Sequence, residues 1–180
     1  MTTPTVLFGG ALDAPPEFAF PILQAIGWTS LHWARLEQHL DALLITLHKQ
    51  EFFATHLKRR PGSSWAQKVD LFSQWFSQHD QLKQFVSTVN RLSANFKNAG
   101  LDRNMLLHSN CIDFVEGPPS KMVALYIRGN KTGDIEQKRA EWTRDQILEF
   151  ANVVANLNKD LQSITSVILT ETFLSSLGKS

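Results

Sequence analysis

The chain has 180 residues, of which 43% are hydrophobic and 19% charged, and its formal net charge is +1. This composition is typical of a single soluble globular domain with a core of ordinary size, and it excludes an intrinsically disordered chain. So small a charge also excludes the basic excess with which many proteins bind duplex nucleic acid nonspecifically.

Cysteine content and hydropathy restrict the compartment. The single cysteine, Cys111, excludes an intramolecular disulfide and a cysteine-rich zinc site. Residues 1–10 lack the basic and apolar regions of a secretory signal, and no apolar run reaches the roughly 18–20 residues of a membrane span. We therefore expect a soluble, cytoplasmic protein without a membrane segment.

The first third of the chain predicts an irregular arm followed by a long helix. Prolines and glycines are frequent in residues 1–20, which we expect to be irregular. Pro21 suits a first helical turn, and Gly27 is expected to bend or interrupt the helix. Apolar residues then recur at steps of three and four over residues 28–50, and a turn at Lys58–Gly62 ends this region.

Capping signals predict the next two helices. In Ser64–Gln67, serine and glutamine have the spacing of a capping box, and an apolar stripe follows. A third helix is expected from Asp80, and Gly100 has the position of a left-handed C-terminal residue. The sequence leaves open whether these helices are continuous through Ser77–His79.

The last third predicts a short helix, a hairpin and a long final helix. Asp102 is the expected N-cap of the short helix, which Gly117-Pro118-Pro119 would end. Residues 122–128 and, more weakly, 135–139 have the pattern of strands. A second capping box, Thr143–Gln146, opens a helix with an unbroken apolar stripe.

Together these elements predict an all-α fold. Amphipathic helices with short connections favour an antiparallel helical bundle, here of four to five helices. A small β-hairpin or extended insertion, within residues 112–142, precedes the last helix. We expect an irregular arm at 1–20, one helical domain over 21–175 and a frayed tail at 176–180.

Residues 103–108, Arg-Asn-Met-Leu-Leu-His, are the stretch with the clearest chemical meaning. On a helix Asn104 and His108 share a face, and Arg103 lies about 140° from His108, which a long guanidinium can span. If Arg103 occupies the first helical position, free amides and the helix dipole also favour a phosphate there. The Asp102 carboxylate would compete for the same donors.

The pattern Arg-Asn-x-x-x-His near the end of a helical bundle resembles the HEPN superfamily (higher eukaryotes and prokaryotes nucleotide-binding). Random placement of the Arg, Asn and His residues of this chain would give about 0.01 copies of it. The resemblance implies a helical-bundle homodimer whose two motifs face each other. Many members are metal-independent endoribonucleases, often toxins with an antitoxin partner or phage-defence components. Others are inactive modules that bind nucleotide, RNA or protein.

In the ribonuclease interpretation the motif residues have distinct roles. His108 removes or donates a proton during attack of the ribose 2′-OH, Arg103 binds phosphate oxygens, and Asn104 orients the imidazole or donates to the phosphate. Some HEPN members place an acidic residue of a neighbouring helix against the motif, for which Glu37 is the candidate and Asp41 the competitor. No metal and no other cofactor is expected.

Structural explanations of the same residues stay open. Arg103 and His108 could simply form intramolecular hydrogen bonds that stabilise the bundle or a dimer. His32 and His39 have no third partner at a spacing typical of a metal site. The tryptophans follow apolar stripes and helix starts, which favours packing over base stacking.

Overall fold

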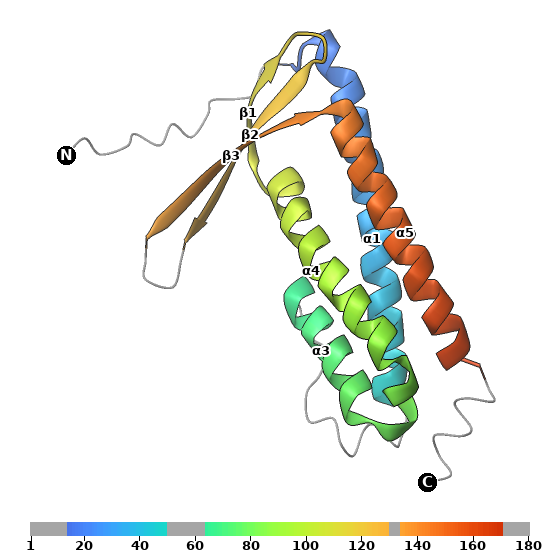
Figure 1. The fold of residues 1–180 in the computed structure, drawn as a ribbon. Coiled ribbons are helices and arrows are strands. Elements are labelled where there is room, and N and C mark those ends of the chain that lie inside the picture. The colour runs from blue at the N-terminus through green and yellow to red at the C-terminus, as the bar shows by residue number, and fades with distance from the viewer. Residues whose placement is uncertain (1–13, 50–63, 130–133, 171–180) are drawn as a thin grey trace.

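The computed structural model describes residues 14–49, 64–129 and 134–170 (Figure 1). These ranges contain four α-helices, two short 3-10 helices and one three-stranded sheet. The helices are η1 Glu17–Ala19, α1 Phe20–Lys49, α3 Trp65–Gln78, η2 Asp80–Phe85, α4 Val86–Leu107 and α5 Arg144–Ile168. The strands are β1 Asn110–Val115, β2 Lys121–Gly129 and β3 Ile135–Thr143. Most of the predicted N-terminal arm, the turn at 58–62 and the tail at 176–180 lie outside the described residues.

Two of the predicted helix starts are confirmed by their caps, whereas Asp80 caps no helix: it is the first residue of η2, which follows His79 without a side-chain cap. Ser64 Oγ accepts from the Gln67 backbone N–H and the Gln67 side chain accepts from the Ser64 N–H, so α3 begins with a complete capping box. The Thr143–Gln146 box opens α5 in the same way. α1 begins at Phe20 and continues through Gly27, so the expected interruption there is wrong.

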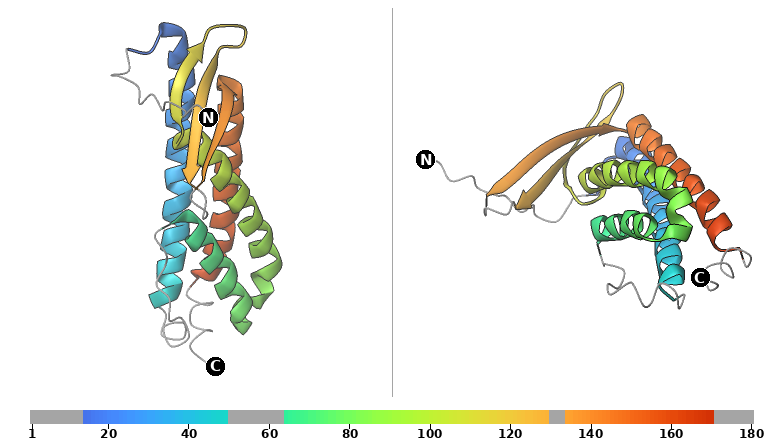
Figure 2. Two further views of the ribbon diagram at one scale, coloured as in Figure 1. Left: turned by 90° about the vertical axis from the view of Figure 1, so that its left-hand side faces the viewer. Right: turned by 60° about the horizontal axis from the view of Figure 1, so that its bottom comes forward.

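The described helices form a bundle in which α4 runs against the other three. Thr29 of α1 donates to the Ile147 carbonyl of α5, and further toward the C-terminal ends of both helices His39 of α1 contacts Asn158 of α5. The two helices are therefore parallel. Figures 1 and 2 show the same directions. The predicted antiparallel arrangement is therefore correct for α4 but wrong for α1 against α3 and α5. The antiparallel prediction assumed that consecutive helices are joined by short connections. The chain between the end of α1 at Lys49 and the start of α3 at Trp65 is long enough for both helices to start at the same end of the bundle.

The core is the contact zone of these four helices. Its largest fully buried side chains are Ile22, Leu36, Leu40, Leu43, Leu44, Leu47, Phe72, Trp75, Phe76, Leu82 and Phe96. All of these except Ile22 and Trp75 belong to the apolar stripes that the sequence predicts. His79 separates α3 from η2 with an extended backbone, so the second and third predicted helices are not continuous through Ser77–His79.

Gly100 lies inside α4 and does not end a helix. α4 continues to Leu107, so the predicted separate short helix capped by Asp102 does not exist. The glycine is explained by packing: a Cβ at Gly100 would lie 2.7 Å from Cδ1 and 2.9 Å from Nε1 of Trp65. The Trp65 Nε1–H also donates to the Phe96 carbonyl at 2.9 Å. Close contact between α3 and α4 therefore requires a residue without a side chain at this position.

This explanation predicts that Gly100→Ala destabilises the protein by about 1–3 kcal/mol, the usual cost of overpacking. In a Trp65→Leu background the clash is gone, and the same substitution should stabilise α4 by up to about 1 kcal/mol because alanine favours a helix. Urea unfolding of the four proteins measures both values. Equal destabilisation in the two backgrounds would contradict the packing explanation.

The segment after α4 is a sheet of order β1-β2-β3 with antiparallel pairs. The expected helical continuation to Gly117 is thus replaced by β1, whose register shifts between Cys111 and Asp113. β3 is also longer than the predicted weak strand. Met122 and Ala124 of β2 are buried against the helical core, whereas the far part of the β2–β3 ribbon extends away from the helices (Figure 2).

Candidate functional site

The hexapeptide forms the C-terminal end of α4. Residues 103–107 are helical, and His108 is the C-cap, with its backbone N–H donating to the Asn104 carbonyl at 3.2 Å. The sequence-based expectation that free helix amides bind a phosphate at Arg103 is therefore wrong. Because this is the end of the helix where carbonyl groups are free, the dipole stabilises a cation and gives no help with an anion. Anion binding must rest on side chains.

Arg103 and His108 do lie in contact with each other. Nη1 of Arg103 contacts Nε2 of His108 and donates to Oδ1 of Asn104 at 3.1 Å. His108 leaves the helical conformation (φ −114°, ψ 3°), so its ring is placed by a residue that no longer follows the helix geometry. The guanidinium is further held over the Trp33 indole, 5.4 Å from the ring centroid.

The guanidinium has unused hydrogen-bonding capacity. Nη2 takes part in none of these contacts, and Nε is shielded from solvent without a hydrogen-bond partner within the described ranges. Arg103 is half-buried and His108 is exposed. A ligand oxygen that approaches from the solvent side therefore meets a fixed cation beside an accessible imidazole.

Two effects lower the pKa of His108 below its ordinary value of 6.5: partial burial of the ring and, secondarily, the charge of Arg103. The imidazole is consequently mostly neutral at pH 7. In the neutral ring, Nε2 accepts from Arg103 and the proton is on Nδ1.

NMR titration of the His108 ring should accordingly give a midpoint below 6.5. Removing the guanidinium charge in Arg103→Gln should move the midpoint upward, while Arg91→Gln, which removes a surface arginine paired with Asp160, should leave it in place. The pKa of His108 is lower in the folded chain than in the unfolded chain, so the folded state loses stability as the pH falls below about 6.5. A midpoint above 6.5 in the wild type would contradict the assignment.

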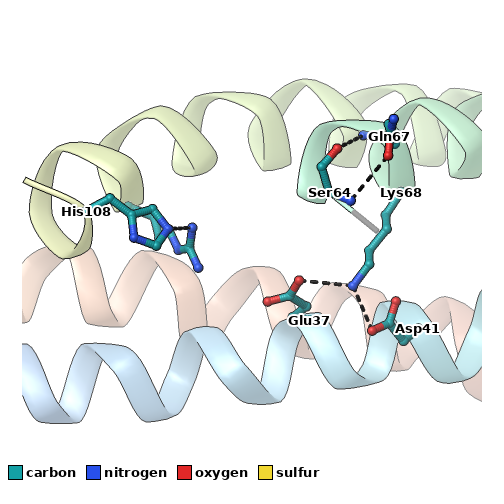
Figure 3. Close-up of polar contacts among 7 residues, drawn as sticks. Glu37, Asp41, Ser64, Gln67, Lys68 and His108 are labelled. Atoms are coloured by element: carbon teal, nitrogen blue, oxygen red, sulfur yellow. Dashed lines mark hydrogen bonds and ion pairs between the residues drawn. The ribbon is translucent and has the colours of Figure 1, made fainter. Parts of the chain in front are cut away.

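Glu37 does not pair with Arg103 as expected from the resemblance. Its carboxylate accepts from Lys68 at 3.0 Å, and Asp41 accepts from the same ammonium at 2.8 Å (Figure 3). Burial alone lowers the pKa of Lys68, but hydrogen bonds to Asp41 and Glu37 raise it above its ordinary value overall. Lys68 of α3 therefore holds both competing carboxylates of α1, and sequence reasoning missed it because lysine is usually exposed to solvent.

Asp102 lies apart from the arginine–histidine pair. It lines a hollow between α4 and α5 together with Asn98 and Asp160. Burial raises the pKa of its carboxyl group. Its expected roles, as a helix cap and as a competitor at Arg103, are both wrong because α4 has no N-terminus at this position.

A hollow of about 550 Å³ lies beside Arg103, between α1, α3 and α4. Arg103 and Asn104 form one wall, and the Trp65 indole forms part of another. An ion pair between Lys97 and Asp70, 2.8 Å long, also lines it, and both partners are more than half exposed. Glu37 reaches the same hollow. The structure thus brings Glu37 and the motif to one cavity without a direct ion pair between them.

The described parts of the chain were also compared with the patterns of metal sites and membrane spans. No group of three or more His, Cys, Asp or Glu side chains is placed there to hold a metal ion. Each helix within those ranges is too short or too polar to cross a lipid bilayer. Comparisons with models of known protein families, with curated proteins and with solved structures found no match.

Proposed function

We propose that the chain is a HEPN-like, metal-independent endoribonuclease that acts as a homodimer. The observation that carries the proposal is the contact between Arg103 and His108 at an exposed helix end. It joins a permanent cation to an imidazole that is mostly neutral at pH 7, the two groups needed to bind a phosphate and accept a proton beside it.

The proposed mechanism uses these two side chains in order. An RNA phosphate draws the guanidinium into hydrogen bonds with its oxygens, which releases Nε2 of His108 from Arg103. Nε2 then takes the proton of the adjacent ribose 2′-OH, and the 2′-oxygen attacks phosphorus. The P–O5′ bond breaks, a 2′,3′-cyclic phosphate forms, and the leaving 5′-oxygen takes a proton from a second imidazole, which enters the step as the imidazolium and leaves it neutral. A two-fold dimer supplies that group as the second copy of His108.

The alternative is a non-catalytic module that binds nucleotide or RNA at the same place. It is favoured by one observation: in the free chain, Arg103 occupies the lone pair on Nε2 that a base would need. On this alternative the imidazole serves to fix the guanidinium for phosphate binding. The two functions share a site and differ only in whether RNA is cut.

The two are separated by incubating the protein with RNA in EDTA and identifying the product ends. We expect cleavage that persists in EDTA and leaves 2′,3′-cyclic phosphate and 5′-hydroxyl ends. A substrate with 2′-deoxyribose at the cleaved position should stay intact, because it lacks the attacking oxygen. Tight binding of RNA that remains uncut would favour the binding module, and cleavage of the 2′-deoxy substrate would contradict the proposed chemistry.

A further inference from the structure

The hollow beside Arg103 has polar groups of two kinds at different places. The cation for a phosphate is Arg103, which lines the hollow and contacts His108. Inside the hollow, Glu37 contributes a carboxylate, of which only Oε1 is bound to Lys68. Oε2 of Glu37 has no hydrogen-bond partner in the described ranges and is an acceptor without a donor. The cavity is therefore suited to a ligand with two parts: a hydrogen-bond donor that meets Glu37, and beside it a negatively charged group that meets Arg103.

Asn104 adds a donor to this lining. Its Oδ1 accepts from Arg103 Nη1, which orients the amide and leaves Nδ2 to donate. The indole of Trp65 supplies apolar wall, and it is fixed there by its hydrogen bond to the Phe96 carbonyl. A flat ring could thus lie against apolar surface while its edge meets an acceptor and a donor.

We propose that this hollow is a guanine subsite, in which the Glu37 carboxylate accepts from N1–H and N2–H of the base next to the phosphate held by Arg103. Guanine has two adjacent donors on its Watson–Crick edge, which match the two oxygens of a carboxylate, and an acceptor, O6, which suits the Asn104 amide. Adenine and cytosine offer one exocyclic amine on that edge and uracil one ring N–H. The volume of about 550 Å³ is ample for a purine.

The inference rests on the proposed function for the phosphate beside the base, but base binding can be measured without cleavage. Calorimetry with guanosine 3′-monophosphate and adenosine 3′-monophosphate should show about ten- to hundredfold tighter binding of the guanine nucleotide, the usual discrimination of one bidentate pair. Glu37→Gln should abolish this preference and keep the Lys68–Asp41 pair. Asp70→Asn, which removes a carboxylate of the same hollow that is paired with Lys97, is the matched control and should keep the preference.

Inosine 3′-monophosphate gives a second measurement on the unaltered protein. It keeps N1–H but lacks the N2 amine, so its affinity should lie between those of the guanine and adenine nucleotides. Equal binding of guanine and adenine nucleotides, or a preference that survives Glu37→Gln, would overturn the subsite. The remaining outcomes separate the two proposals. Selective guanine binding by a protein that cuts no RNA would refute the ribonuclease and keep the subsite. EDTA-resistant cleavage without base preference would support the ribonuclease and refute the guanine subsite.

Discussion

Replacing His108 by alanine is expected to lower the rate of RNA cleavage by about 10²–10⁴-fold, the usual contribution of general acid–base catalysis. The loss should fall on kcat more than on KM, because the imidazole acts on the proton of the 2′-OH and Arg103 still binds the phosphate. Steady-state kinetics on a short fluorogenic RNA in EDTA measures both constants. The fold should be preserved, since His108 is an exposed helix cap with no place in the core.

The matched control is His39→Ala. This variant also removes a histidine, but His39 contacts Asn158 and Gln162 of α5 and has no contact with Arg103. Its activity should remain near that of the wild type. Equal traces of cleavage in the wild type and in His108→Ala would indicate a contaminating nuclease and contradict the assignment of His108.

Replacing Arg103 by lysine is expected to reduce kcat by about 10²–10³-fold, the cost of losing one preorganised donor to a developing anion. Lysine keeps the positive charge, but it lacks the planar fork that contacts Asn104, His108 and a phosphate together. The shorter lysine side chain should also hold its charge farther from His108, so the pKa of His108 should rise part of the way toward its ordinary value. Kinetics in parallel with the ring titration of His108 measures both effects.

Arg91→Lys is the control for this substitution, because the ion pair of Arg91 in the described ranges is an exposed one with Asp160, 3.6 Å long. It should leave kcat unchanged. Full activity of Arg103→Lys would show that charge alone is sufficient at this position, and the forked contact between Arg103 and a phosphate would then have to be abandoned.

Local patterns predicted the helices well because each carries its own signal. The stripes of α1 and α5 and the two capping boxes are contained within single segments, so no tertiary information was needed. Gly100 shows the limit of this reasoning. A glycine that ends a helix and a glycine that admits a neighbouring indole look alike in sequence, and only the position of Trp65 distinguishes them.

That one glycine also explains the largest error at the site. Ending α4 at Gly100 placed Arg103 at a helix start, where a phosphate would be favoured, whereas it lies near a helix end. The approach of Arg103 to His108 was still predictable, because the two residues are five positions apart at one helix, and this spacing lets the long guanidinium reach the imidazole. The partner of Glu37 was not, since the contact with Lys68 depends on the parallel packing of α1 and α3.

The central claim is that Arg103 and His108 act as one unit on an RNA phosphate, and a double-mutant cycle tests it most directly. It compares kcat/KM for RNA cleavage in the wild type, Arg103→Ala, His108→Ala and the double variant. Because each side chain needs the other, we predict that the double variant is hardly slower than the slower single variant. Losses that multiply, or a single variant with undiminished cleavage, would show that the two side chains act independently and would contradict the claim.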